Sequence, residues 1–337
     1  MRRFVILVLV ALVAVGVILS RTIHHPGVTT PSASAPTSTT STTPAPIAPL
    51  TGRPDPGGAA LRRPALTIKI ENTPEALPQW GVAQADVVYE EIVNGGITRL
   101  AAVFNSQAPG KVGPVRSVRP TDTQVVYPLG GIFAFSGGAP YAIASIQTAP
   151  VKLVDESSAG DAMYRDPNLL APHNLFARAP LLFRLGGTPT PPPALFTYRG
   201  PGQAVTGPTV ARVVVPFPSI YPVTWTWDAA TGSWDRTLFG KPDVTGTGQR
   251  ESPQNVVVME VTYVNGVGTF NSYADLQGSG PVTVFTDGHE ETGTWSRGSS
   301  PADVIHYDGA NGQPIALTPG QTWVELLDNA VAPQVTR

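Results

Sequence analysis

The sequence contains no cysteine, so disulfide bonds and lipid attachment through a cysteine side chain are both excluded. Charge is sparse as well, because only 14% of the 337 residues are charged and the formal net charge is −2. A general nucleic-acid-binding protein normally presents a strongly basic face, so nucleic acid is not an expected partner. Without disulfides the fold must depend on its hydrophobic core, and a chain of this length supplies one.

Most motifs with a known chemistry are missing too. The five histidines show no metal-ligand spacing, and neither a Walker nor a dinucleotide-binding glycine pattern occurs. The segment FSGGAP around Ser136 lacks the Gly-x-Ser-x-Gly elbow of many serine hydrolases. We therefore expect no metal and no cofactor.

An apolar run does mark the N-terminus. Residues 4–20 are apolar and follow two arginines at positions 2 and 3. The run exceeds most signal-peptide cores, and Ser20-Arg21-Thr22 behind it matches a cleavage site poorly. Residues 1–23 are therefore predicted to be a signal-anchor helix that leaves the rest of the chain outside the cell membrane. Cleavage after this segment would instead give a secreted protein.

Composition shifts divide the remaining chain. Residues 24–61 are rich in Ser, Thr, Pro and Ala and are predicted to be a disordered tether. Residues 62–186 carry mixed patterns and residues 209–329 carry strand patterns, so we expect an α+β domain followed by an all-β domain. The Pro- and Gly-rich stretch 187–208 is predicted to link them, and residues 330–337 to form a tail.

Within the first domain, strands are predicted over 65–72, 85–93, 98–106 and 130–138, and helices over 121–127, 141–147 and 173–185. Gly95-Gly96 predicts a hairpin between the second and third strands. In the second domain Trp225 and Trp227 share one strand face and Trp234 lies across a predicted hairpin. These aromatics fit either a glycan-stacking surface or, more commonly, sheet packing.

The stretch KVGPVRSVRPTD, residues 111–122, places Arg116 and Arg119 three positions apart. Pro120 directs Arg119 out of the helical region, and Thr121 with Gln124 fits a capping box, so a helix is predicted to begin at this bend. Two guanidinium groups beside free backbone amides would form an anion site for a carboxylate or phosphate.

A second interpretation remains open, in which both arginines pair with the chain's own acids. Glu90, Glu91 and Asp122 are the candidates, and half-buried Arg–Glu pairs are common in protein scaffolds. Such pairing would leave any partner binding to the second domain.

Further polar residues complete the predicted ligand site. Arg99 follows the Gly95-Gly96 turn, and His173 with Asn174 stands at the start of the helix predicted over 173–185. The expected site comprises Arg99, Arg116, Ser117, Arg119, His173 and Asn174, with Glu90 orienting the arginines. An alternative is an envelope hydrolase or transferase with His173 as general base and Ser117 or Ser136 as nucleophile.

The order of several segments resembles the YerB-like family of bacterial envelope proteins, whose two domains are catalogued as of unknown function. The resemblance is carried by IKIEN, ADVVYEEIVNGGITRLAAVF, GPVRSVRP, FSGGAP and YRDPNLLAPHNLF in the first half. In the second half it is carried by SWDRTLFGKP, NVVVMEV, GSGPVTVFTDGHEETGTW and ALTPGQTWVEL. It spans roughly residues 62–329. Many relatives are lipoproteins, whereas this chain lacks the cysteine and would be attached by its N-terminal segment.

The resemblance adds weight to specific polar positions. The family's recurring residues fall on Asp86, Glu90, Thr98, Arg99, Arg116, Ser117, Arg119, Pro172, His173 and Asn174. It implies a membrane-tethered, extracytoplasmic protein, and we expect a non-catalytic binding or scaffold module. Expected partners are the membrane, through the N-terminal segment, and an anionic group of peptidoglycan, a wall polymer or an acidic envelope protein.

Overall fold

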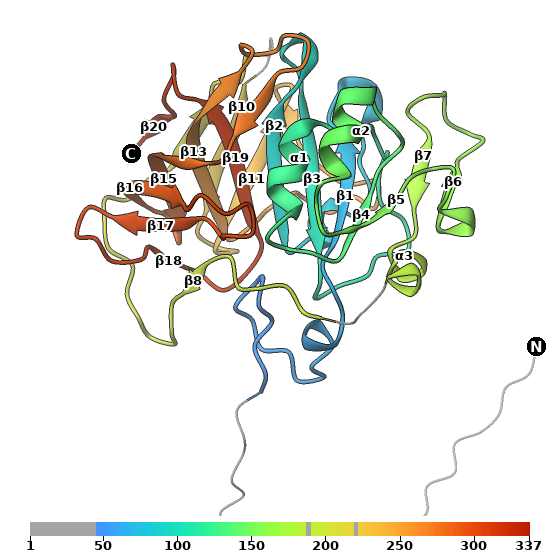
Figure 1. Ribbon diagram of the computed structural model, residues 1–337. Coiled ribbons are helices and arrows are strands. Elements are labelled where there is room, and N and C mark those ends of the chain that lie inside the picture. The colour runs from blue at the N-terminus through green and yellow to red at the C-terminus, as the bar shows by residue number, and fades with distance from the viewer. Residues whose placement is uncertain (1–44, 187–189, 219–221) are drawn as a thin grey trace, which may run out of the picture. The chain divides into compact units, whose positions relative to one another are not determined.

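The computed structural model describes residues 45–186, 190–218 and 222–337, and its main feature is an 11-stranded mixed sheet (Figure 1). Along the sheet the strands are β17 (His306–Gly309), β16 (His289–Arg297), β15 (Gly278–Thr286), β13 (Asn255–Val264), β19 (Thr322–Asp328), β2 (Val87–Ile92), β3 (Thr98–Phe104), β1 (Leu66–Glu71), β4 (Ile132–Ala134) and β5 (Lys152–Val154). Strand β14 (Tyr273–Asp275) pairs with β13 off this path.

A five-stranded antiparallel sheet packs on one face of the large sheet. It runs β12 (Lys241–Pro242), β11 (Ser233–Leu238), β10 (Val223–Asp228), β9 (Arg212–Val215) and β20 (Gln334–Thr336). Trp225 of β10 lies edge-on to Trp323 of β19, and Trp234 of β11 lies edge-on to Phe285 of β15. Trp225 and Trp234 are fully buried, so these two aromatics pack in the core between the sheets, as the more common of the two interpretations predicted.

Helices α1 (Pro120–Val126) and α2 (Pro140–Ile146) cover the opposite face, where they pack on Phe133 of β4 (Figure 1). A third helix, α3 (Ala179–Leu185), follows β7, and each of the three has proline in its first turn. The 3-10 helices are η1 (Ala60–Arg62), η2 (Pro74–Ala76), η3 (Val82–Gln84), η4 (Asn94–Gly96) and η5 (Gly160–Ala162). Two small ladders, β6 (Met163–Arg165) with β7 (Leu175–Ala177) and β8 (Thr197–Tyr198) with β18 (Ala316–Leu317), complete the β-rich α+β fold.

The predicted strands over 65–72, 85–93 and 98–106 are confirmed as β1, β2 and β3. Strands β2 and β3 form the expected hairpin, and Gly95 and Gly96 both take the positive φ angles that such a turn requires. The strand predicted over 130–138 is shorter, since β4 ends at Ala134. Helices α1 and α2 begin one residue before the predicted positions.

The helix predicted over 173–185 is wrong in its first half. Leu175–Ala177 is strand β7, which pairs with β6, and the helix begins only at Ala179, where Pro180 occupies the first turn. His173 therefore lies in a turn before a strand and does not cap a helix.

The predicted boundaries also need correction. The tether does not extend to residue 61, because Ala48, Leu50 and Ala60 are buried in the folded unit. The two predicted domains share one sheet, in which β19 pairs in parallel with β2. Leu195 and Phe196 of the predicted linker are buried, and β20 of the predicted tail pairs with β9.

The predicted signal-anchor at 1–23 lies outside the described residues. Among the helices that the structure describes, none has the length and apolar character needed to cross a bilayer.

Candidate functional site

Arg99 of β3 lies between Glu71 of β1 and Glu91 of β2 in the large sheet. In the strand register Glu71 of β1 is opposite Arg99 of β3, and Glu91 of β2 is opposite Arg99 on its other side. Cross-strand partners point to the same face of a sheet, so these three side chains lie on the face that carries α1. Lys69 lies two residues before Glu71 and shares that face by the period-two alternation.

Lys69 is fully buried and holds two acids together. Its ammonium group donates to Glu91 and, at 2.7 Å, to Asp122 of α1. Burial raises the pKa of Asp122 to about 6, and the adjacent Lys69 limits that rise. Glu91 and Asp122, which were candidate partners of Arg116 and Arg119, are thus engaged by a lysine.

Arg116 pairs with Glu71 instead. Its Nη2 atom lies 2.6 Å from Glu71 Oε1, and the Glu71 side chain is only 2% exposed. His173 joins this pair, since its Nδ1 atom lies 3.0 Å from Glu71 Oε2 and 3.4 Å from Arg116 Nη2. The turn before β7 therefore brings His173 to the arginines, 57 residues further along the chain.

Arg99 and Arg119 contact carbonyl oxygens and form no ion pair within 4 Å among the described residues. Arg99 Nη1 donates to the Ser117 carbonyl at 3.0 Å, and Arg119 Nη1 donates to the Val118 carbonyl at 2.9 Å. Burial, followed by repulsion from Arg119 and Arg116, lowers the pKa of Arg99 to about 10. An arginine offers five N–H donors, and the hydrogen bonds to described residues use only Nη1 of each group.

The whole cluster carries excess positive charge. We call it the arginine cluster, and its members are Lys69, Glu71, Glu91, Arg99, Arg116, Arg119, Asp122 and His173. Four cations face three carboxylates, which leaves one uncompensated positive charge even with His173 neutral. The Nε atoms of Arg116 and Arg119 are buried and have no hydrogen-bond partner among the described residues. A small anion would supply both the charge and the acceptors.

The expected helix amides at this bend are not free. Asp122 Oδ2 accepts the Arg119 backbone N–H at 2.7 Å, so the acid caps α1 itself. Thr121 Oγ1 accepts the Ala274 amide, and Gln124 Oε1 accepts the Leu276 amide, so neither completes the predicted capping box. The Arg119 and Asp122 amides are thus both engaged within the chain.

Glu90 does not orient the arginines. It follows Tyr89 and precedes Glu91 on β2, so its side chain points to the opposite face of the sheet from Glu91. There Glu90 Oε2 lies 2.6 Å from Arg236 Nη2 of β11, and both side chains are fully buried. Glu325 of β19 lies beside this pair, and burial together with the nearby Glu90 raises its pKa well above the usual range.

Asn174 also lies outside the arginine cluster. Its Oδ1 atom accepts from Arg165 Nη1 at 2.7 Å, and its Nδ2 atom donates to the carbonyl oxygens of Asp166 and Leu169. Asn174 therefore fixes the loop between β6 and β7, and through that loop the position of His173.

The hydroxyl groups of Ser117 and Ser136 lie next to each other. Ser117 Oγ lies 3.5 Å from Ser136 Oγ, and the Ser136 amide donates to the Arg116 carbonyl at 3.0 Å. Within the described residues no hydrogen bond joins His173 to either hydroxyl, because its Nδ1 atom faces Glu71 and Arg116. The described residues also contain no group of three or more His, Asp and Glu side chains arranged for a metal ion.

A cavity of about 650 Å³ adjoins the cluster at His173. Its lining is largely apolar and aromatic, with Trp80, Phe176 and the strongly exposed Leu170. Lys111 lies over both aromatic rings, 4.3 Å from the Trp80 centroid and 4.2 Å from the Phe176 centroid. Glu75, Asp166 and His173 are further polar residues of the lining.

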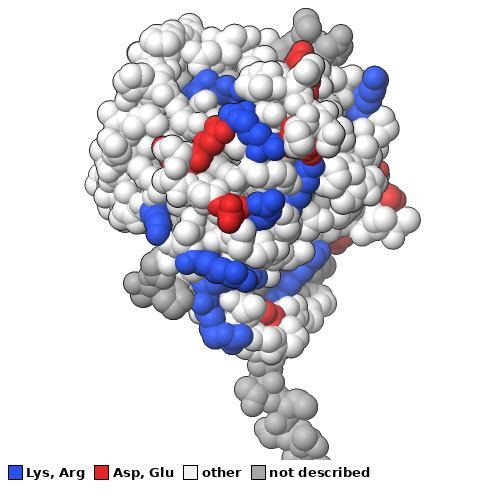
Figure 2. Space-filling view, turned by 90° about the vertical axis from the view of Figure 1, so that its right-hand side faces the viewer, with Lys and Arg blue, Asp and Glu red and all other residues white. Residues whose placement is uncertain are grey.

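Figure 2 shows that Lys and Arg side chains gather on the face that carries β5, β6, β7 and α3. The elements there contribute Lys152 from β5, Arg165 from β6 and Arg184 from α3. These exposed cations add to the positive potential around the molecule on this side.

Sequence reasoning missed Lys69, Glu71 and Arg236. In the strand LTIKIE, Lys69 and Glu71 are two residues apart and therefore share one face. This spacing is the signal that could have placed both residues in the site. The partnership of Arg236 with Glu90 joins residues 146 positions apart and has no local signal.

The fold and the site thus define a two-segment, β-rich protein with a shared sheet and a half-buried arginine cluster. The chain matches two family models, "Protein of unknown function (DUF3048) N-terminal domain" over residues 50–185 and "Protein of unknown function (DUF3048) C-terminal domain" over residues 213–324. The chain belongs to this family, the YerB-like proteins.

One relative is a Bacillus subtilis (strain 168) protein described as "Putative lipoprotein YerB". It is 34% identical over 130 residues, which cover 38% of this chain and 39% of the relative. The crystal structure of YerB protein from Bacillus subtilis superposes with a TM-score of 0.73 at 23% identity, covering 86% of this chain and 99% of that one. This likeness establishes the fold.

Proposed function

We propose that this protein is a membrane-tethered, extracytoplasmic module that binds an anionic group of the cell envelope through Arg99, Arg116 and Arg119. The observation that carries the proposal is the pair Arg99 and Arg119, whose guanidinium groups contact only carbonyl oxygens and lack acidic partners within 4 Å among the described residues. Mutual repulsion of three positive charges raises the free energy of the cluster, and a bound anion would lower it.

The neighbouring features support the same ligand class. His173 links the cluster to the 650 Å³ cavity, and exposed cations on β5, β6 and α3 would steer a polyanion toward this side. Phosphate-bearing wall polymers, peptidoglycan stem-peptide carboxylates and acidic segments of envelope proteins all carry the required group.

The envelope location rests on the relative and on the N-terminal residues. The Bacillus subtilis relative is described as a lipoprotein. This chain has no cysteine, so the apolar residues 4–20 would provide the attachment in place of a lipid.

Titration of the full-length chain with poly(glycerol phosphate) and with a stem peptide tests the proposal. Calorimetry should show saturable binding to at least one of these probes, and the Arg116→Ala, Arg119→Ala double variant should bind at least about 10-fold more weakly, a loss of ~1.4 kcal/mol. For the peptide, amidation of its terminal carboxylate should have the same effect. Raising the salt concentration should weaken binding, since part of the attraction is long-range.

The matched control is the Arg212→Ala, Lys241→Ala double variant, which removes the same charge from two exposed positions of the five-stranded sheet. It should bind like the unmodified chain. Equal binding by both double variants would refute the site. Loss of folding in the Arg116→Ala, Arg119→Ala variant without ligand would favour a scaffolding role for the cluster.

A further inference from the structure

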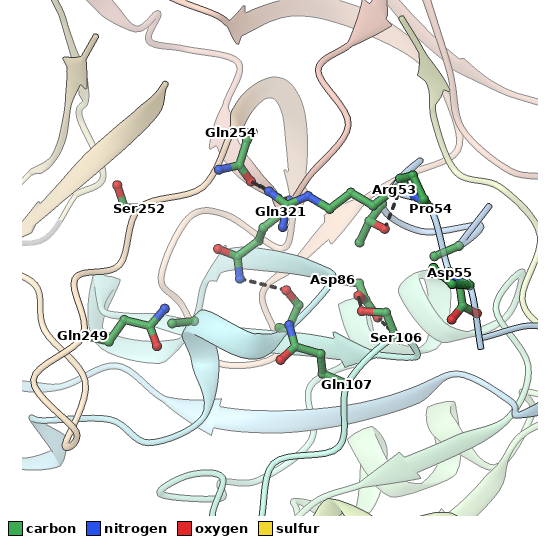
Figure 3. Close-up of a pocket in the computed structure, with 15 residues that line it drawn as sticks. Arg53, Pro54, Asp55, Asp86, Ser106, Gln107, Gln249, Ser252, Gln254 and Gln321 are labelled. Atoms are coloured by element: carbon green, nitrogen blue, oxygen red, sulfur yellow. Dashed lines mark hydrogen bonds between the residues drawn. The ribbon is translucent and has the colours of Figure 1, made fainter. Parts of the chain in front are cut away.

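A second cavity, of about 340 Å³, lies at the far end of β3 from the arginine cluster (Figure 3). Strand β3 begins next to Arg99, and Ser106 and Gln107 beyond its end line this cavity. Seven residues of extended chain separate Arg99 from Ser106 by about 23 Å. The cavity is thus independent of the anion site.

Residues from both family segments form the cavity wall. Asp86, Ser106 and Gln107 come from the first segment, while Gln249, Gln254 and Gln321 come from the second. Four glutamines around one cavity give a lining of neutral groups that both donate and accept hydrogen bonds (Figure 3).

The side-chain amides of Gln321 and Gln254 are each fixed by hydrogen bonds through one of their two polar atoms. Gln321 Nε2 donates to the carbonyl oxygens of Val82 and Ala85 at 3.0 and 2.9 Å. Gln254 Oε1 accepts from Arg53 Nη2 at 2.8 Å and from the backbone N–H of Gln321 at 3.1 Å. The remaining atoms, Gln321 Oε1 and Gln254 Nε2, form no hydrogen bond with a described residue and remain for a ligand.

Gln249 is oriented in the same way. Its Oε1 atom accepts from Gln84 Nε2 at 3.0 Å, which leaves its own NH₂ group available. Figure 3 shows Gln249 and Gln321 on adjacent sides of the open space, with Gln254 beyond Gln321. Donors and acceptors that are fixed before binding lose little conformational entropy when a ligand arrives.

The charged groups of the wall are already engaged. Asp86 is buried and accepts from the amide and hydroxyl of Ser106 and from the amide of Asn105. Asp55 Oδ2 accepts the Ala60 amide at 2.8 Å, and Arg53 donates to Gln254 and to the Pro319 carbonyl oxygen. Arg53 and Asp55 bring opposite charges to the wall, so together they add no net charge that would favour an ion over a neutral ligand.

We infer that this cavity binds a neutral saccharide. Each sugar hydroxyl both donates and accepts a hydrogen bond, which matches the mixture of open amide NH₂ groups and carbonyl oxygens. The volume lies within the range of small-molecule sites. An N-acetylated sugar fits this chemistry further, because its amide can pair with a glutamine amide in both directions.

Calorimetric titration of the full-length chain with N,N′-diacetylchitobiose, an uncharged disaccharide, tests the inference. We expect saturable binding, and we expect Gln249→Ala and Gln107→Ala each to weaken it about 3- to 10-fold, the effect of losing one neutral hydrogen bond. Both side chains are exposed, so their removal should leave the fold intact.

Gln313→Ala is the matched control, since Gln313 is an exposed glutamine outside the cavity and should be replaceable without effect. The Arg116→Ala, Arg119→Ala variant should also keep saccharide binding, which separates this inference from the proposed anion site. Absence of saturable binding by the unmodified chain would overturn the inference. Equal affinity of the Gln249→Ala, Gln107→Ala double variant and Gln313→Ala would also overturn it.

Discussion

Glu90 and Arg236 form an ion pair, 2.6 Å apart with both side chains fully buried, that joins the two family segments. Arg236 also binds Asp243 and lies 4.6 Å from the centroid of the Trp323 ring. The guanidinium group is thus enclosed between the large sheet and the five-stranded sheet, where no water replaces a lost partner.

Removing the arginine should therefore destabilise the whole unit. Arg236→Met would leave Glu90 and Asp243 as buried carboxylates without their counter-charge, and we expect a loss of about 3–5 kcal/mol in the free energy of unfolding. Urea denaturation measures this change. The control, Arg250→Met, breaks a partly exposed 3.4 Å contact with Asp235 and should cost about 1 kcal/mol or less. Similar losses in both variants would contradict the central role of Arg236.

Stability should depend on pH through Glu251. Burial and the nearby Asp243 raise the pKa of Glu251 from its usual 4.5 to about 8. Between these two pH values the folded chain keeps a proton that the unfolded chain has released, so stability falls as pH rises through this window and levels off above it.

Glu251→Gln should remove this contribution. Relative to the unmodified chain, the variant should gain stability between pH 5 and pH 9, with the gain at pH 9 on the order of a few kcal/mol. Urea denaturation at both pH values gives the comparison. Glu156→Gln, at a partly exposed position, should show a much smaller change. A pH-independent difference between Glu251→Gln and the unmodified chain would count against this prediction.

Arg119→Gln should separate binding from folding. The substitution removes one of the charges that lower the pKa of Arg99, so relief of repulsion offsets the lost hydrogen bond to Val118. We expect the free energy of unfolding to change by less than ~1 kcal/mol, while affinity for poly(glycerol phosphate) falls about 10-fold. Thermal unfolding with and without this probe measures both effects. Severe destabilisation without ligand would show that the cluster serves the fold instead.

Two adjacent glycines before β4 should differ sharply in their tolerance of alanine. Gly130 and Gly131 both have positive φ angles. A Cβ at Gly130 would meet nothing within 4 Å, whereas one at Gly131 would lie 2.1 Å from the Ala65 carbonyl oxygen. Gly130→Ala should cost about 1–2 kcal/mol from the backbone angle alone.

Gly131→Ala should cost clearly more, because the added methyl group pushes β4 away from β1. Denaturant midpoints of the two variants, measured side by side, test this difference in stability. Equal midpoints would mean that the chain at β4 can move aside without loss.

Local patterns predicted much of the first half correctly. Strands β1, β2 and β3 follow from alternating apolar residues, and their hairpin follows from Gly95-Gly96. The sequence pattern predicts helix α3 to begin too early, because Leu175 and Phe176 fit a helical pattern as well as a strand. Pairing with β6 on one side and with Val112 and Val115 on the other makes this segment a strand, and these pairings are tertiary contacts.

By itself the sequence determined that the chain combines a few helices with many strands, that it forms no disulfides, and that a helix begins beside Arg119 at Pro120, because these depend on composition and on neighbours along the chain. Tertiary structure alone decided the partners: Glu71 for Arg116, Lys69 for Glu91, and Arg236 for Glu90. The physical reason is that alternate side chains of a strand face opposite sides of the sheet. What each side meets is set by elements such as β11, α1 and the turn at His173, which arrive from distant parts of the chain.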